Sequence, residues 1–357
     1  MAKQSLSQLG NDLYSGKKSF NIVGRRKLWY LIALGLIVVA LVGPFIRGGY
    51  QLGIEFTGGS QFQVHLPEGA DRDPAVATEV VQQQLPGTEP RVLLVGASDI
   101  QVQTEQLEPS QSIALADELA AAYGVTNDEV TSSFIGAVWG QDVTRQALIA
   151  LVVFLIFAAI VMAVYFRTWK MSLAALIALG HDLVLTAGVY GLSGFEITPA
   201  AVIGFLTILG YSLYDTVVVF DKIRENTAPE EMNGRRTFAE AVNLGVNQTL
   251  VRSINTSVVA LLPVASILFI GAAVLGAGTL RDIALALFIG ILVGAYSTIF
   301  IAAPVYSHLR ERESAIVEND DEVRKARARG VDTLARKPRR VVKKKADTSV
   351  DPYANVG

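Results

Sequence analysis

The sequence predicts a polytopic α-helical membrane protein with six transmembrane helices and a small extracytoplasmic α+β domain between the first two. Three observations support this fold class. The chain has 357 residues, 51% of them hydrophobic, and a positive mean hydropathy, which is too apolar for an ordinary soluble protein of this size. Six apolar stretches approach the length of about 20 residues that a bilayer requires. One polar, acidic segment, residues 47–146, separates the first stretch from the other five.

The six apolar stretches define the expected spans. Aromatic residues cluster at their ends, where amphipathic rings prefer the membrane interface. The charged leader, residues 1–27, is followed by no small-x-small cleavage site, so we expect the first stretch to remain as a span. The predicted spans are 28–46, 147–166, 171–193, 197–220, 253–275 and 283–305.

The distribution of basic residues predicts the orientation. The leader contains six Lys and Arg, and the tail, residues 306–357, contains thirteen. Residues 47–146 contain only four, against fourteen Asp and Glu. Because basic residues accumulate on the cytoplasmic side, we expect both termini in the cytoplasm and residues 47–146 outside.

The acidic segment has the pattern of a small folded domain. Alternating residues at 60–66 predict a strand, and residues 91–107 predict one or two more around a Gly-Ala-Ser-Asp turn. Helices are expected at 74–85 and 109–124, where each begins with proline, and a last strand at 129–138. The order βαββαβ indicates a ferredoxin-like α+β domain.

Asp215 lies within an otherwise apolar, small or uncharged run, "GYSLYDTVVVF". An ionised carboxylate inside hydrocarbon costs roughly 2.5–3.5 kcal/mol on insertion scales. A residue kept at that cost is by default a candidate proton or ion site, and we predict that role for Asp215. The alternative is a structural carboxylate that a neighbouring hydroxyl caps.

Arg252 is the expected partner of Asp215. It lies at the cytoplasmic boundary of the fifth span, in "NQTLVRSINTS", at a depth similar to that of Asp215 on the preceding antiparallel helix. An apposed arginine would favour the ionised acid, so a change in their distance would switch its proton affinity. The alternative is an arginine that extends to the interface.

His181 and Asp182 lie near the middle of the third span and are weaker candidates for the same pathway. Their side chains point about 100° apart on a helix, so they are poorly placed to bind one metal. With three histidines and no cysteine, the sequence predicts no metal site, and it contains no phosphate-binding loop. We therefore expect no cofactor and no covalent catalysis.

Two segments expected in the cytoplasm, residues 237–250 and the tail from residue 306, have different sequence patterns. Residues 237–250 predict an amphipathic surface helix. The tail from residue 306 is basic and poor in apolar residues, so we expect it to be disordered. Its candidate contacts are anionic lipid or nucleic acid on a ribosome, and no specific nucleic acid is indicated. We favour the other interpretation, a solvated segment that helps to fix the topology.

Several strings together resemble the SecF proteins of the bacterial SecD/SecF export family. They are "FNIVGRRKLWYLIALGL", "LGIEFTGGSQF", "HDLVLTAGVYGLSGFEIT", "GYSLYDTVVVFDKIREN" and "NQTLVRSINTS", and the resemblance extends over about residues 20–309. Two positions depart from the family pattern: Tyr214 stands where Asn is usual, and Glu55 where Asp is usual. Tyr214 could alter the hydration next to Asp215.

The resemblance implies a half-transporter of the resistance-nodulation-division type in the bacterial cytoplasmic membrane. It implies a SecD-like partner subunit and a role at the SecYEG channel, where the proton gradient assists the translocating polypeptide. YidC and YajC are further implied partners. By the same resemblance, Asp215 and Arg252 match the proton-pathway residues of the family.

An alternative function comes from the same superfamily. A half-subunit of a proton-driven lipid or drug exporter would share the spans and the buried acid. The acidic segment 47–146 shows no obvious apolar pocket, which favours a polypeptide partner over a lipid or a drug.

Overall fold

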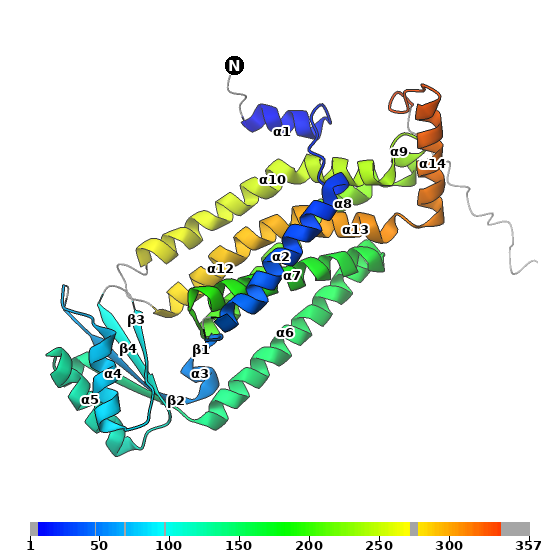
Figure 1. Ribbon diagram of the computed structural model, residues 1–357. Helices are drawn as coiled ribbons and strands as arrows, with labels where there is room; N and C mark the ends of the chain where they lie inside the picture. The colour runs from blue at the N-terminus through cyan, green and yellow to red at the C-terminus, as the bar shows by residue number, and fades with distance from the viewer. Residues whose placement is uncertain (1–5, 47, 68, 96–97, 272–277, 337–357) are drawn as a thin grey trace, which may run out of the picture. The chain divides into compact units, whose positions relative to one another are not determined.

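The computed structural model describes residues 6–46, 48–67, 69–95, 98–271 and 278–336 (Figure 1). Contacts divide the chain into two compact units. The large unit comprises Arg25–Val217 and Leu250–Ala302 and contains the α+β domain. The small unit comprises Met1–Gly24, Val218–Thr249 and Ala303–Gly357.

Among the described residues, six helices are long and apolar enough to cross a membrane, in agreement with the predicted number of spans. Several begin earlier than predicted, because a helix satisfies its own backbone and can continue into polar sequence. Residues 237–250 do not form a separate helix but mostly begin the fifth one. Residues 272–275 of the predicted fifth span lie outside the described residues. The helices are α2 (Arg26–Ile46), α6 (Ala137–Phe166), α7 (Trp169–Ser193), α8 (Pro199–Asn226), α10 (Phe238–Ser266, continued by η3, Ile267–Gly271) and α12 (Gly278–Ser297, continued by η4, Thr298–Ala302, and α13, Ala303–Arg310).

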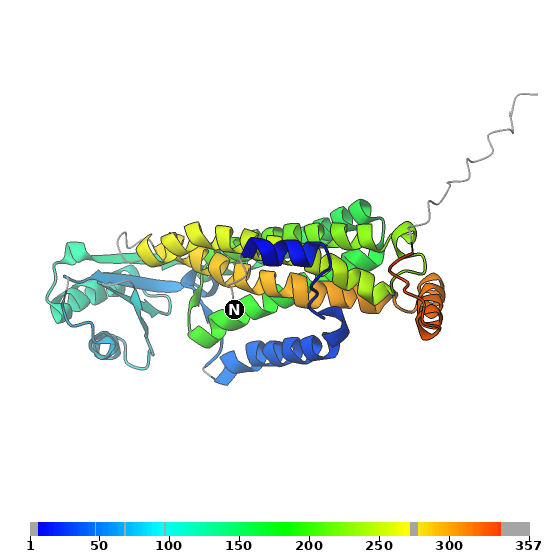
Figure 2. The same cartoon turned by 90° about the horizontal axis from the view of Figure 1, so that it is seen from above.

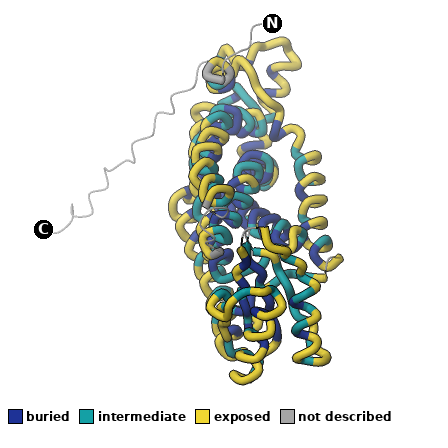
Figure 3. The backbone as a smooth tube through the Cα atoms, turned by 90° about the vertical axis from the view of Figure 1, so that its left-hand side faces the viewer, coloured by how far each residue is buried: buried dark blue, intermediate teal, exposed yellow. Residues whose placement is uncertain are grey.

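The six helices differ in how far they are buried. In α7, α8 and the sixth span, about half of an apolar stretch of 18 residues is buried. In α2, α6 and α10, at most 17% of the corresponding stretch is buried. Figure 3 shows the same contrast between exposed helices and a buried interior. Small residues allow close packing: a Cβ added at Gly188 of α7 would lie 2.2 Å from Cβ of Ala40 on α2. His181 and Asp182 of α7 and Ser212, Asp215 and Thr216 of α8 are buried inside the protein.

The α+β domain follows the predicted order of elements. A four-stranded antiparallel sheet has the order β3-β4-β2-β5, and two helices pack on it (Figures 1 and 2). Asp73 caps the first of these helices by accepting a hydrogen bond from the N–H of Ala75. The elements are β2 (Gly59–His65), α4 (Pro74–Gln84), β3 (Arg91–Val95), β4 (Asp99–Thr104), α5 (Pro109–Tyr123) and β5 (Val130–Ile135).

The two central strands divide their side chains between two faces. Phe62, Val64, Ile100 and Val102 are fully buried against α4 and α5. The alternate positions form a second, polar face, because successive side chains of a strand point to opposite sides. We call it the glutamine face; its residues are Gln61, Gln63, Gln101 and Gln103.

A short two-stranded ribbon joins the first span to the turn between α7 and α8. β1 (Gln51–Leu52) pairs in parallel with β6 (Glu196–Ile197). A four-residue helix, α3 (Ile54–Thr57), follows β1. Gly58 and Gly59 then turn the chain into β2 with positive φ angles of 74° and 135°. At Gly59 an added Cβ would lie 2.4 Å from the carbonyl oxygen of Thr104, so the turn requires glycine.

The small unit holds part of the leader against the start of α10. Asn247 accepts a hydrogen bond from the N–H of Phe20 at 2.7 Å and donates to its carbonyl at 3.0 Å. Asn243 accepts from the N–H groups of Ile22 and Val23. The side-chain amides of these two asparagines thus satisfy the backbone groups of residues 20–23, as a neighbouring strand would.

The tail differs from the expected disorder in its first part. Residues Ser314–Ala328 form α14, in which Val323 is fully buried and Arg327 makes two hydrogen bonds with Glu240 at 2.7 and 2.9 Å. A few apolar residues at helical spacing and this ion pair suffice to order a segment that composition alone marks as polar. Residues 337–357, the rest of the expected disordered tail, lie outside the described residues.

Candidate functional site

Asp215 lies in the interior of the large unit. It is 6% exposed, and its carboxylate accepts a hydrogen bond from the hydroxyl of Ser253 on α10. Tyr214, the neighbouring residue that departs from the family pattern, is 59% exposed and points away from the interior. The helix therefore turns Asp215 inward and Tyr214 outward.

The structure does not join Asp215 to Arg252. Within the described residues, no ion pair connects them, and Arg252 is exposed. Because Ser253 follows Arg252, and adjacent side chains point about 100° apart, the helix that places Ser253 on the acid turns Arg252 away from it.

Asp182 is the second buried acid of the helices. It is 1% exposed, and its Oδ2 accepts a hydrogen bond of 2.6 Å from the hydroxyl of Ser212 on α8. His181, which is 4% exposed, places its Nδ1 3.4 Å from Oδ1 of Asp182. Its ring also lies 5.9 Å from the ring of Tyr296. The two predicted residues are thus brought together, and both are buried.

Further hydroxyl groups lie along α8, beyond the pair of Asp182 and His181. Ser212, which bonds Asp182, is one turn before Asp215. Thr216, next to Asp215, shares a hydrogen bond of 3.0 Å with Thr298, the first residue of the π-helical segment η4. Gly294 of α12 leaves room for the Ser212 hydroxyl, since a Cβ added there would lie 3.1 Å from Oγ of Ser212. Such π-helical turns are frequent at functional sites.

The arrangement suits groups that change protonation. A serine hydroxyl can donate to a carboxylate and can accept from a carboxylic acid, so it fits both states. Asp182 and Asp215 each have such a partner. His181 Nε2 and the Tyr296 hydroxyl are buried with no hydrogen-bond partner among the described residues.

Sequence reasoning missed the two serines. Ser212 and Ser253 lie inside the quoted strings "GYSLYD" and "VRSINTS", and each stands within three residues of a charged candidate. The signal that identifies them is spacing. Ser212 shares a face with Asp215 at i and i+3, and Ser253 lies beside Arg252.

A second group of acids lies where the glutamine face meets the ribbon. Glu55, Glu196 and Asp282 line one cavity of about 600 Å³. Burial raises the pKa of the Glu55 carboxyl above its usual 4.5, and the charges of Glu196 and Asp282 add to that shift. Glu55 is therefore easier to protonate in the folded protein than in the unfolded chain.

We expect Glu55→Gln to stabilise the protein at neutral and higher pH. A carboxyl whose pKa is raised by folding favours the folded state below its unfolded pKa and loses that contribution as the pH rises through its folded pKa. The melting temperature of Glu55→Gln should therefore exceed that of the wild type at about pH 8, and the difference should shrink towards pH 4.5. The exposed Glu79→Gln is the matched control; an equal gain there would show a general effect of charge removal.

Comparison with known proteins agrees with this architecture. The family model described as protein export membrane protein SecD/SecF, C-terminal, matches residues 116–312. The protein translocase subunit SecF of Streptomyces coelicolor is 42% identical over 91% of this chain and 86% of its own length. That of Mycobacterium tuberculosis is also 42% identical, over 89% of this chain and 73% of its own.

Some larger relatives match this chain over less than half of their own length. The protein translocase subunit SecDF of Thermus thermophilus is 32% identical over 83% of this chain and 39% of its own length. The crystal structure of SecDF from Thermus thermophilus superposes with a TM-score of 0.70 at 30% identity, covering 83% of this chain and 39% of that one. On this evidence the chain belongs to the SecD/SecF family of multi-pass protein export membrane proteins, as a SecF-like member.

Proposed function

We propose that this SecF-like chain is a translocase subunit that uses the proton gradient to assist protein export and membrane insertion through the Sec channel. The observation on which this rests is Asp215, a carboxylate 6% exposed within a membrane-spanning helix and bonded by Ser253. Proton uptake and release there would favour one or the other of two helix arrangements. No covalent reaction is involved.

The energy available is adequate for such a step. A proton that crosses the membrane releases about 2.3 kcal/mol for each 100 mV. Arg252, which acts on Asp215 through its charge, would bias the proton affinity as the helices move. Asp182 and His181 would serve as a second station, linked to α8 by Ser212.

The α+β domain would be a ferredoxin-like domain outside the membrane, where it meets the emerging polypeptide. The strand order β3-β4-β2-β5 and the two helices on one face support that assignment. The charge distribution supports the orientation, with both termini in the cytoplasm. The basic tail would contact anionic lipid.

The family membership supports a proposal for the partners. A SecD-like subunit would supply the other half, and SecYEG, YidC and YajC would complete the assembly. A half-subunit of a lipid or drug exporter is the second candidate, but the relatives reported above are named as translocase subunits.

The test measures export into inverted membrane vesicles from cells with and without the chain. The gradient-dependent part of export is the difference between energised vesicles and vesicles with an added uncoupler. We expect that part to disappear without the chain, while ATP-driven export continues. Equal gradient dependence in both preparations would reject the proposal.

The orientation has its own test in this cysteine-free chain. Single cysteines at Gly124, the end of α5, and at Gly234, between α9 (Pro229–Met232) and α10, should differ in reactivity with an impermeant thiol reagent. Only the first should be labelled in intact cells, and both should be labelled after lysis. Labelling at Gly234 in intact cells would reverse the orientation.

A further inference from the structure

The glutamine face is hydrogen-bonded to the turn that precedes α8. Gln103 Nε2 donates to Oε1 of Glu196 at 2.5 Å, and Gln101 Nε2 donates to Oε2 at 3.2 Å. Each carboxylate oxygen therefore has its own donor from β4. The two glutamines are two positions apart on one strand, so they point to the same side.

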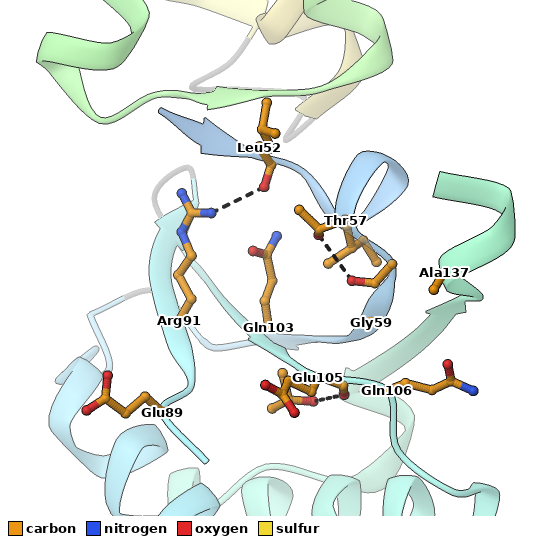
Figure 4. A pocket seen from close by; sticks show the side chains of 12 residues that line it. Leu52, Thr57, Gly59, Glu89, Arg91, Gln103, Glu105, Gln106 and Ala137 are labelled. Carbon is orange, nitrogen blue, oxygen red and sulfur yellow. Dashed lines mark hydrogen bonds between the residues drawn. The ribbon is translucent and has the colours of Figure 1, made fainter. Parts of the chain in front are cut away.

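A third glutamine orients these two amides. Oε1 of Gln61 on β2 accepts from Gln101 at 2.8 Å and from Gln103 at 3.3 Å. Each amide has two hydrogens, and each can thus bond Gln61 and Glu196 at once. We call these four residues, Gln61, Gln101, Gln103 and Glu196, the Glu196 clasp. Arg91 makes a separate contact between the sheet and the ribbon, because it donates a hydrogen bond to the carbonyl of Leu52 at 3.3 Å. Figure 4 shows Arg91 and Gln103 extending towards β1.

Glu196 is directly connected to the helix that bears Asp215. Two residues later, Thr198 accepts a hydrogen bond from the N–H of Ala201 in the first turn of α8 and donates to Asp282 at 2.8 Å. From Pro199 to Asp215 the helix is continuous. At 1.5 Å per residue, about 24 Å of rigid helix separates the clasp from the buried acid.

Side-chain hydrogen bonds connect the sheet to the turns at this junction. The cavity of about 600 Å³ separates part of the sheet from the turns, and its polar lining includes Gln61, Gln101 and Glu196. The charged groups around Glu196 are Glu55 of α3, Asp282 and Arg281 at the start of α12, and Arg91 of β3. Loss of the clasp would remove two side-chain hydrogen bonds between β4 and the turn before α8.

We propose that the Glu196 clasp transmits the proton-driven movement of α8 to the α+β domain, with Glu196 as the positioning residue. The clasp stays closed while α8 moves, so the sheet follows the helix. This inference rests on the proposed function, because it names the mechanical link by which the buried acid would act on the polypeptide.

Glu196→Ala and Gln103→Ala are the first variants to measure. Each should assemble and keep ATP-driven export, but should lose most of the gradient-dependent export, and the double variant should lose no more than either single one. Gln63→Ala is the matched control, because Gln63 lines the same cavity but bonds Asp99, and it should behave like the wild type. Full gradient dependence in Glu196→Ala would overturn the proposal.

A reversible link gives a second and independent test. In the cysteine-free chain, Glu196→Cys with Gln103→Cys removes the clasp, and a short reducible bis-methanethiosulfonate reagent joins the two thiols again. The linked protein should regain gradient-dependent export and lose it on reduction. A linked form that is inactive while the reduced form is active would mean that the clasp must open, which contradicts the proposal. The linked and the reduced forms are compared within one sample. This test can therefore decide whether the clasp transmits movement even if Glu196→Ala assembles poorly.

Asp215→Asn, measured in the same vesicles, separates the two proposals. If the wild type shows no gradient-dependent export, the proposed function fails. If Asp215→Asn abolishes it and Glu196→Ala does not, the function stands and the clasp is rejected.

Discussion

Asp215→Asn abolishes gradient-dependent export while the protein still inserts and assembles: this is the largest effect that we expect. Asparagine keeps the size of the side chain and accepts the Ser253 hydrogen bond, but it cannot bind or release a proton. Since coupling between sites typically changes equilibria by about 5–150-fold, a loss of about tenfold or more is expected. The measurement is uncoupler-sensitive export in vesicles, normalised to the amount of assembled complex.

Related variants distinguish a proton site from a structural carboxylate. Asp215→Glu should keep part of the coupling, because the longer acid still titrates. Arg252→Met should impair coupling without lowering the protein level, because it removes a charge that acts on the acid without contacting it. Ser253→Ala should have a smaller effect, since it removes one hydrogen bond and leaves both charged groups. If Asp215→Asn is as active as the wild type, the carboxylate is structural.

The second large effect concerns assembly. The chain expressed alone should accumulate poorly, and coexpression with the SecD-like subunit should raise its level in the membrane and yield a stable complex on purification. The reason is that α2, α6 and α10, whose apolar stretches are at most 17% buried, leave surfaces on which the helices of a partner can pack. The chain also covers only 39% of the similar SecDF protein of Thermus thermophilus, which is consistent with a partner that supplies the other part.

The control is coexpression with an unrelated multi-pass protein at the same level, which burdens membrane insertion equally. Quantitative immunoblots of membranes and the composition of the purified complex are the measurements. An unchanged level, no co-purification and a homo-oligomer in detergent would instead favour the exporter.

The sequence by itself determined the membrane class, the six spans and the elements of the α+β domain. These features follow from local signals. Apolar runs of bilayer length need no tertiary contact to be recognised, and the alternation in "SQFQVH" and "DIQVQT" marks β2 and β4 as strands with one apolar and one polar face. Pro74 and Pro109 likewise predicted the starts of α4 and α5.

Asp215 and Asp182 were also predictable, because an acid within a span is costly wherever it points. Their partners were not. Arg252 and Ser253 are adjacent in sequence, and only the rotation of α10 decides which side chain meets Asp215. The pairing of Asp182 with Ser212 depends in the same way on how α7 and α8 pack.

Only the tertiary structure decided the two polar assemblies that join distant segments. Glu196 meets Gln101 and Gln103 across more than 90 positions of the chain, and α14 is ordered by contacts such as that between Arg327 and Glu240. Hydrogen bonds and ion pairs depend on distances of about 3 Å and on direction. Composition and periodicity predict which face of a helix or strand is polar, but the partner of that face is set only when the elements pack.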